Sequence, residues 1–246
     1  MTTEETPAKF DRELLNELAR GAQKVFENAE ALFFEAKILS AAGALSRALF
    51  LHQISLEECA KIETMGAWAV SILAGIPVEG DKVLLGLTRH ANKNRTNAYM
   101  LEGSAEELAA RERGDWGAAL AEFKRLQEEF HAKSNAAKNA SLYVDFESEK
   151  FFAPVDKITA DMVGEIATRN ETFLGLMFPK VKMLSKWAQV PEETQESVVA
   201  FIRLAEAARA KKQDDAMAAI KNLIDEFLQS ELAKRVAKTG KDEADA

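Results

Sequence analysis

The sequence predicts an all-α protein of about seven helices with one irregular insertion. Three features indicate this fold class. Ala, Leu, Glu and Lys, which favour helices, dominate the 246 residues. Only five prolines and twelve glycines interrupt them. Long stretches repeat apolar residues at three- and four-residue steps, which is the period of one helix face.

The first two helices are expected over residues 10–39 and from Ser46 to about Ala74. Gly43 is expected to end the first helix or to mark a close approach, and Ser46 to cap the second. Gly75-Ile-Pro77 then predicts a turn. The apolar side chains that define the first helix are Leu14, Leu15, Leu18, Ala22, Val25, Phe26, Ala29, Leu32 and Phe33.

The middle of the chain predicts a third helix over residues 83–101 and further helical sequence as far as about Ala140. Ser104-Ala-Glu-Glu107 has the pattern of a capping box, which opens the next helix. Gly114-Asp-Trp-Gly117 is expected to break this stretch, after which a long helix resumes.

Residues 141–154 differ from the rest of the chain. Ser141-Leu-Tyr-Val-Asp-Phe146 and Phe151-Phe-Ala-Pro154 are rich in the β-branched and aromatic residues of extended chain. The segment is too short to build a sheet. We therefore expect an ordered loop with one hairpin.

The C-terminal part predicts three further helices, capped by Thr159, opened by Pro191 and running over residues 214–236. No internal repeat and no linker rich in Gly, Ser or Pro divides the chain. We expect one helical domain over residues 8–238, flanked by polar tails over 1–7 and 239–246.

Composition limits the classes of function. Apolar residues make up 47% and charged residues 29%, enough for a sizeable core under a solvated surface. The net charge of −8 argues against broad coating of nucleic acid or of an anionic membrane. The single cysteine, Cys59, provides neither an internal disulfide nor a cysteine metal motif. With a polar N-terminus and no long apolar run, the sequence predicts a soluble cytoplasmic protein without contact to a membrane.

The second predicted helix carries the first candidate group of functional residues. Glu57 and Glu58 lie four and three residues before Lys61, so both carboxylates can reach one ammonium group. Arg47 lies close to three helical turns before Glu58 and shares its stripe. The alternative is a structural network of ion pairs or an exposed pair, which is common on helices and which this group taken alone favours.

The second candidate group is the basic run Arg89-His90-Ala-Asn-Lys93-Asn-Arg95. His90 and Lys93 are one turn apart on a helix and project together. Histidine moves protons near neutral pH, and the lysine and arginines suit phosphate. The alternative is a solvated basic face with no function.

The other histidines fit known motifs poorly. Arg47 and His52 form an Arg-x4-His string, but five residues rotate the two side chains about 140° apart on a helix. We expect His52 in the core or at an interface. Glu128-x-x-His131 is a single Glu-x-x-His element, whereas di-iron bundles need two, so we expect no metal and no other cofactor.

The order of these groups resembles the AbiV family of bacterial abortive-infection proteins, which in turn resembles the wider HEPN superfamily of helical domains. The resemblance covers roughly residues 29–167. Its matching pieces are Ser46-Arg-Ala-Leu49, Glu57-Glu-Cys-Ala-Lys61, His90-x-x-Lys93, Lys138, Leu142-Tyr143-Val-Asp145, and Pro154 before Ile158-Thr159.

The resemblance implies an HEPN-like bundle and a role in stopping phage propagation at the expense of the infected cell. Many HEPN proteins are ribonucleases, which implies metal-independent cleavage of RNA. Their signature is an arginine followed by a histidine late in the bundle, and this chain has it only at Arg47 and His52. A ribonuclease mechanism would therefore use His90 for proton transfer, with Lys93 beside it.

In that mechanism Glu57, Glu58 and Lys61 orient the catalytic groups, and the phosphate contacts come from Arg89, Arg47, Arg95 and Lys138. Tyr143 and Asp145 complete the family motif. The alternatives are a binding module that docks a phage or host protein, and a plain helical scaffold. A homodimer is expected, because fourteen phenylalanines leave apolar faces to cover and HEPN-like proteins commonly pair. RNA and a triggering phage protein are the other expected partners.

Overall fold

The computed structural model describes residues 10–81, 83, 87 and 104–209, with side chains as far as residue 203. This part of the chain is almost entirely helical, and its one sheet has two strands. The predicted all-α class is therefore confirmed. The expected helices over 83–101 and 214–236 fall outside the described residues.

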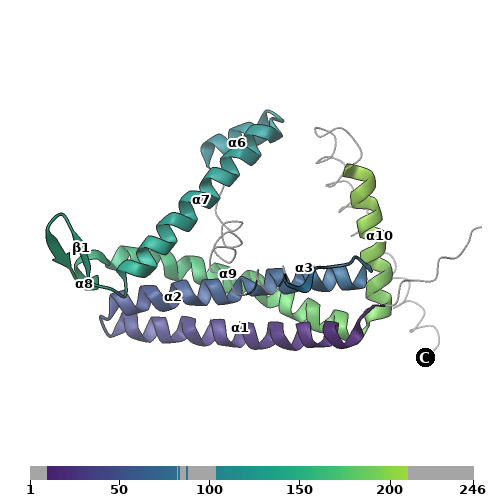
Figure 1. Ribbon diagram of the computed structural model, residues 1–246, viewed down its shortest axis with the longest axis horizontal. Coiled ribbons are helices and arrows are strands. Elements are labelled where there is room, and N and C mark those ends of the chain that lie inside the picture. The colour runs from purple at the N-terminus through teal and green to yellow at the C-terminus, as the bar shows by residue number, and fades with distance from the viewer. Residues whose placement is uncertain (1–9, 82, 84–86, 88–103, 210–246) are drawn as a thin grey trace, which may run out of the picture.

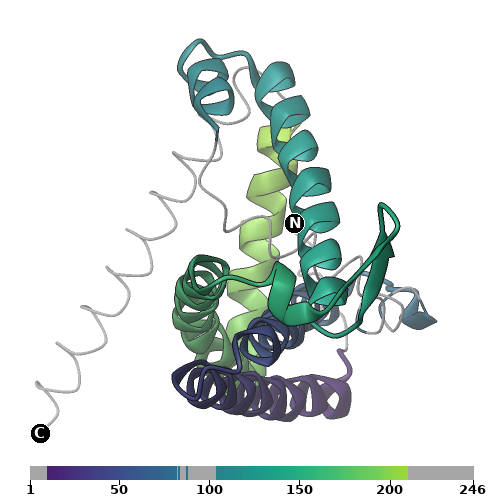
Figure 2. The same cartoon turned by 90° about the vertical axis from the view of Figure 1, so that its left-hand side faces the viewer.

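The body of the molecule is a bundle of long helices. α1 (Arg12–Ala41) runs antiparallel to α2 (Leu45–Cys59), α3 (Lys61–Leu73) continues in line with α2, and α9 (Ala160–Gln189) packs along all three. Figure 2 views the bundle from one end and shows α1, α2 and α9 side by side.

The core lies between these four helices because each contributes one apolar stripe. On α1 small and large side chains alternate along this stripe, so the neighbouring helices approach closely at the alanines. The main core residues are Leu15, Leu18, Ala22, Phe26, Ala29 and Phe33 of α1, Leu56, Cys59, Ala60, Ile62, Ala69 and Leu73 of the α2–α3 segment, and Phe173, Leu174, Met177, Val181 and Leu184 of α9.

The turn between α1 and α2 forms where glycine predicted it. Gly43 adopts a φ of +76°, which glycine reaches without the clash that a Cβ would cause. The expected Ser46 cap is wrong, because α2 begins at Leu45 and Ala44 provides no capping side chain. The single helix expected over 46–74 is interrupted at Ala60, a residue that gives no local signal for a break.

Two helices project from the same side of the bundle, near its opposite ends (Figure 1). α7 (Trp116–Ala140) rises from the end where α2 begins, and α6 (Ala105–Glu112) folds back against it. α10 (Pro191–Arg209) rises from the other end, with the proline at its first position as expected. Ser104 caps α6 by accepting a hydrogen bond from Glu107 N, but the Glu107 carboxylate pairs with Arg111, so only half of the expected capping box forms.

The irregular insertion is an antiparallel hairpin of β1 (Asp145–Glu147) and β2 (Lys150–Phe152), followed by the short α8 (Pro154–Lys157). Ser148 and Glu149 both have positive φ, as in the two-residue turns that suit the twist of a hairpin. Thr159 then caps α9, as predicted. In the described residues no helix is long and apolar enough to cross a membrane.

Candidate functional site

α2 is the central helix of the candidate site, since it contacts α1, α9 and α7. Its buried polar side chains are His52, Gln53, Ser55 and Glu57. Buried polar groups cost free energy unless they have partners.

Glu57 is paired with Lys138 of α7. Lys138 Nζ donates to Glu57 Oε1 over 2.8 Å, and the two side chains are only 11% and 3% exposed. An ion pair this far from water leaves a large penalty if either partner is removed. The pair therefore fixes the end of α7 against α2.

Two further contacts hold the same interface. Gln53 donates to Ser134, and Arg47 donates to the carbonyl oxygen of Ser141 at 3.0 Å. Ser134 and Lys138 share one face of α7, because they are one turn apart, and Ser141 follows at the C-terminal end of the helix. The Arg47 guanidinium lies at the C-terminus of α7, where unpaired carbonyls and the helix dipole favour a cation.

Glu58 turns away from Glu57 and pairs with Lys61 over 2.6 Å. The two carboxylates thus do not share one ammonium group: Glu58 uses Lys61 and Glu57 uses Lys138. Cys59 follows Glu58 in the sequence and is buried, and burial, with Glu63 and Glu58 nearby, raises the pKa of its thiol well above the ordinary value. The thiol therefore stays protonated and unreactive near neutral pH.

His52 is buried in the core, as the sequence predicted. Asn170 Nδ2 lies 3.2 Å from His52 Nδ1, and the ring packs edge-on against Phe33. Burial, and then the nearby Lys37, lower the pKa of His52 to about 4. Arg47 and His52 therefore act in different places, and in the described structure they do not form the arginine–histidine pair of HEPN ribonucleases.

The remaining predicted residues lie elsewhere. Tyr143 is 61% exposed beside the hairpin, and Asp145 pairs with Lys157, which also binds Glu147. In the part of the chain that the structure describes, no three His, Cys, Asp or Glu side chains are grouped to hold a metal ion. The basic run Arg89, His90, Lys93 and Arg95 falls outside the described residues, so its predicted orientation by Glu57, Glu58 and Lys61 stays a prediction.

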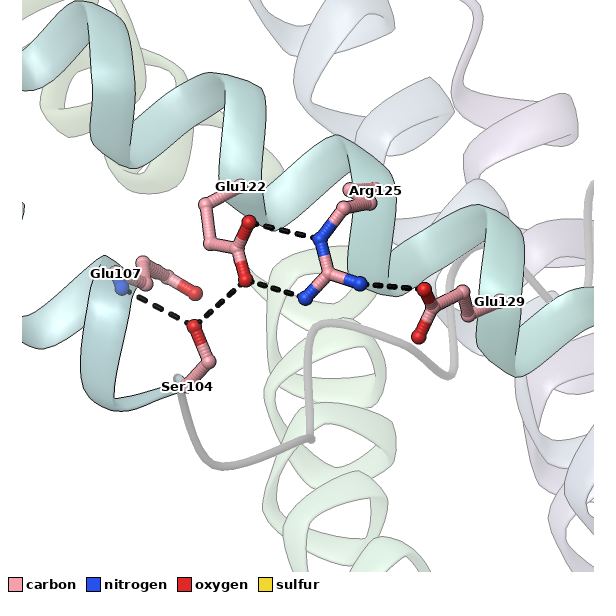
Figure 3. A network of polar contacts seen from close by, with 5 residues as sticks. All are labelled: Ser104, Glu107, Glu122, Arg125 and Glu129. Carbon is pink, nitrogen blue, oxygen red and sulfur yellow. Dashed lines mark hydrogen bonds and ion pairs between the residues drawn. The ribbon is translucent and has the colours of Figure 1, made fainter.

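Sequence reasoning missed a network that joins α6 to α7 (Figure 3). Ser104 donates to Glu122, and Arg125 binds both Glu122 and Glu129. The Arg125 hydrogen bond, followed by the Ser104 one, lowers the pKa of Glu122 to about 2. The i,i+3 and i,i+4 spacings on α7 are visible in the sequence, whereas the link to Ser104 depends on how α6 folds back.

A second feature that the sequence did not predict is a pocket of about 370 Å³ between α2, α7 and α9. In this pocket the Arg169 guanidinium lies over the Phe130 ring, 4.6 Å from its centroid. These residues are far apart in the sequence and each belongs to an ordinary amphipathic pattern, so no local signal marks them.

One comparison finds a relative of similar sequence. The uncharacterised protein y4gJ of Sinorhizobium fredii (strain NBRC 101917 / NGR234) is 44% identical over 110 residues, which cover 45% of this chain. The chain spans 57% of the length of that relative. No solved structure matches the chain.

The sequence model of the AbiV family, which is of the HEPN type, matches residues 17–175. The match runs from the first turns of α1 into the middle of α9 and includes the whole α2–α7 interface. It extends beyond residues 29–167 at both ends and covers more than half of the chain. The protein therefore belongs to the AbiV family of HEPN-type abortive-infection proteins.

Proposed function

We propose that the protein acts in the cytoplasm in defence against phage, and that its effector step is metal-independent cleavage of RNA. Family membership is the observation that carries the defence role. The cleavage step rests on the resemblance to HEPN ribonucleases and on the basic run around His90. It requires no cofactor.

In the proposed reaction His90 accepts the proton of a ribose 2′-hydroxyl, whose oxygen attacks the neighbouring phosphorus atom. The bond from phosphorus to the 5′-oxygen breaks and this oxygen takes up a proton from water, which gives a 2′,3′-cyclic phosphate and a new 5′-hydroxyl end. Lys93, Arg89 and Arg95 stabilise the negative charge that develops on the phosphate.

The described geometry supports a positioning role for the polar residues of α2. Glu57 is 2% exposed and bound to Lys138, so neither group is placed to meet substrate. Arg47 is likewise engaged with the end of α7. We propose that Glu57, Glu58 and Lys61 position the catalytic groups for the reaction. Arg47 and Lys138 hold α7 against α2.

The test is incubation of the purified protein with total RNA in EDTA. We expect wild type to cleave and His90→Ala and Lys93→Ala to fail, whereas Lys124→Ala, which removes an exposed charge from α7, cleaves as wild type does. Intact RNA with wild type, or cleavage that survives His90→Ala, contradicts the mechanism.

A second candidate function is docking of a phage or host protein. The observation that favours it is a group of exposed apolar side chains on and beside the hairpin: Tyr143, Val144, Phe146, Phe151 and Val155, between 61% and 77% exposed. Phe146 and Phe151 also face each other across the strands, with ring centroids 4.8 Å apart. Exposed apolar patches of this kind mark protein interfaces.

Docking and cleavage predict different results for Phe146→Ser/Phe151→Ser. If the hairpin receives a phage trigger, this variant loses protection in infected cells but cleaves purified RNA at the wild-type rate. Full protection by the variant contradicts docking at the hairpin.

A further inference from the structure

The pocket between α2, α7 and α9 combines an apolar wall with charged groups. Leu49 and Gln53 come from α2, Phe130 and Lys133 from α7, and Glu165 and Arg169 from α9. Its volume of about 370 Å³ falls at the lower end of the range for small-molecule sites, which is roughly 300 to 1,000 Å³. The pocket has room for one small ligand.

Arg169 is the group that most clearly lacks a partner. Its side chain is half-buried with the guanidinium over Phe130, and within the described residues it forms no ion pair or hydrogen bond. Burial outweighs the attraction of Glu165 and lowers the pKa of Arg169. A guanidinium carries five N–H donors, so this geometry favours a ligand that brings acceptor oxygens.

The other charges leave the α7 side of the pocket positive. Glu129 is bound by Arg125, which offsets its negative charge. Lys133 lies one turn after Phe130 on the same face of α7, is exposed, and forms no ion pair in the described part of the chain. Lys133 and Arg169 are therefore the two cations available to a ligand.

This combination of groups suits one nucleotide. The aromatic ring and the arginine plane can stack on its base, and the two cations, of which the arginine is one, can bind its phosphate. Unpaired bases stack on phenylalanine rings and on arginine guanidinium planes, while the phosphate binds lysine and arginine. A duplex hides both faces of each base, so it offers nothing to stack.

We propose that this pocket binds a single unpaired nucleotide, with its base against Phe130 and Arg169 and its phosphate on Arg169 and Lys133. The proposal rests on the proposed function, in which RNA is the target, and it identifies the substrate class as single-stranded RNA. The ligand chemistry is that of a nucleotide, either free or within a strand, and the two sources are separated by the test below.

The pocket borders the interface that fixes α7. Gln53, which lines it, donates to Ser134, and Glu57 and Lys138 lie one turn further along α2 and α7 respectively. A nucleotide in the pocket, held by α7 and α9, would therefore lie beside the α2–α7 contacts that include the predicted family residues.

The experiment measures binding in a His90→Ala background, so that cleavage does not consume the probe. The probes are a labelled ten-nucleotide single-stranded RNA, the same sequence as a duplex, and adenosine monophosphate. We expect Arg169→Ala to weaken binding of the single strand about tenfold, since a stacked base contributes roughly 1 to 3 kcal/mol. Lys133→Gln should weaken binding of the single strand less than Arg169→Ala does. It should also lower the salt dependence of that binding by the equivalent of about one phosphate contact.

Two further variants separate stacking from charge and folding. Arg169→Lys keeps the charge but loses the planar group, so its affinity should stay below wild type. Lys124→Gln removes a charge from the same helix outside the pocket and should bind as wild type does. Thermal unfolding of each variant identifies any loss of binding that is due to misfolding.

Equal affinity of Arg169→Ala and Lys124→Gln for the single strand overturns the proposal, and so does equal binding of single strand and duplex. Binding of adenosine monophosphate that depends on Arg169, without binding of the strand, supports the pocket and identifies a free nucleotide as its ligand. Because cleavage is assayed separately through His90, a protein that binds but never cleaves leaves the pocket standing and refutes only the ribonuclease step.

Discussion

Lys138 and Glu57 are 81 residues apart in the chain, yet the lysine Nζ lies 2.8 Å from the glutamate Oε1. This contact joins the projecting helix α7 to the central helix α2. From the sequence, Lys138 was expected to contact phosphate and Glu57 to orient the catalytic groups, and the structure places the two in contact with each other in a nearly water-free interface.

Removing either partner of this pair should destabilise the protein strongly. Glu57→Gln removes the buried carboxylate that Lys138 binds, and Lys138→Met removes the ammonium group that binds Glu57, so we expect each to lose about 3 to 5 kcal/mol in the free energy of unfolding. The double variant should lose less free energy of unfolding than the two single variants lose together. Denaturant titration of all four proteins measures this. A loss below about 1 kcal/mol in each single variant would show that the pair is not a stabilising contact.

The stability of the protein should fall in acid partly through His52. Its pKa is about 4 when folded and 6.5 when unfolded, so the unfolded chain binds a proton first. The contribution of His52 is complete above pH 6.5 and is lost as the pH falls toward 4. The shift of this pKa corresponds to roughly 3 kcal/mol of stability.

The check compares the pH dependence of unfolding for wild type with that of His52→Gln, which stays neutral throughout. Carboxylates titrate alike in both proteins, so the difference isolates His52. Curves of equal steepness between pH 6.5 and 4 would refute the assignment, and His131→Gln on α7 serves as the histidine control.

Ser104→Ala should lower the local stability of α6. The substitution removes the side chain that accepts from Glu107 N and donates to Glu122, and loss of an N-cap costs about 1 kcal/mol. Hydrogen exchange should accelerate over Ala105–Glu112 while the bundle is unaffected. Ser104→Thr keeps the hydroxyl, so equal acceleration in both variants would mean that the cap is unimportant.

The predicted homodimer can be tested at an exposed apolar stripe of α1. Phe34 and Ile38 lie one turn apart and are 53% and 69% exposed, which is costly unless another surface covers them. We expect light scattering to find a dimer of the 27.1 kDa chain and Ile38→Glu to dissociate it. Leu108→Glu, at a similarly exposed site on α6, should not. A wild type that stays at 27.1 kDa at micromolar concentration rules the dimer out.

Features set by neighbouring residues were predictable from the sequence. The period of apolar residues in α1, the Thr159 cap, the break at Gly114–Gly117 and the hairpin all arise from local preferences. The break at Ala60 was not, because alanine favours helix and its backbone there stays in the helical region.

Contacts between distant helices were beyond such reasoning. Glu57 had two lysines within plausible reach of its helix face, and the crossing of α2 by α7 selects Lys138 over Lys61. The pocket likewise exists only because α7 and α9 bring Phe130 and Arg169 together. Spacing along one helix predicts which residues share a face. How the helices cross determines which residues of the neighbouring helix contact that face.

The two parts of the core are far apart in the sequence, and this separation affects folding during synthesis. Ser55 reaches Asn170 across 115 residues, so α1 and α2 leave the ribosome well before α9, which completes their core. At synthesis rates of roughly 5 to 20 residues per second, the delay is about 6 to 23 s. During that time Phe26, Phe33 and Leu56 face solvent on the nascent chain. Synthesis should therefore depend on chaperones that bind apolar segments, and nascent chains that stop before α9 should aggregate.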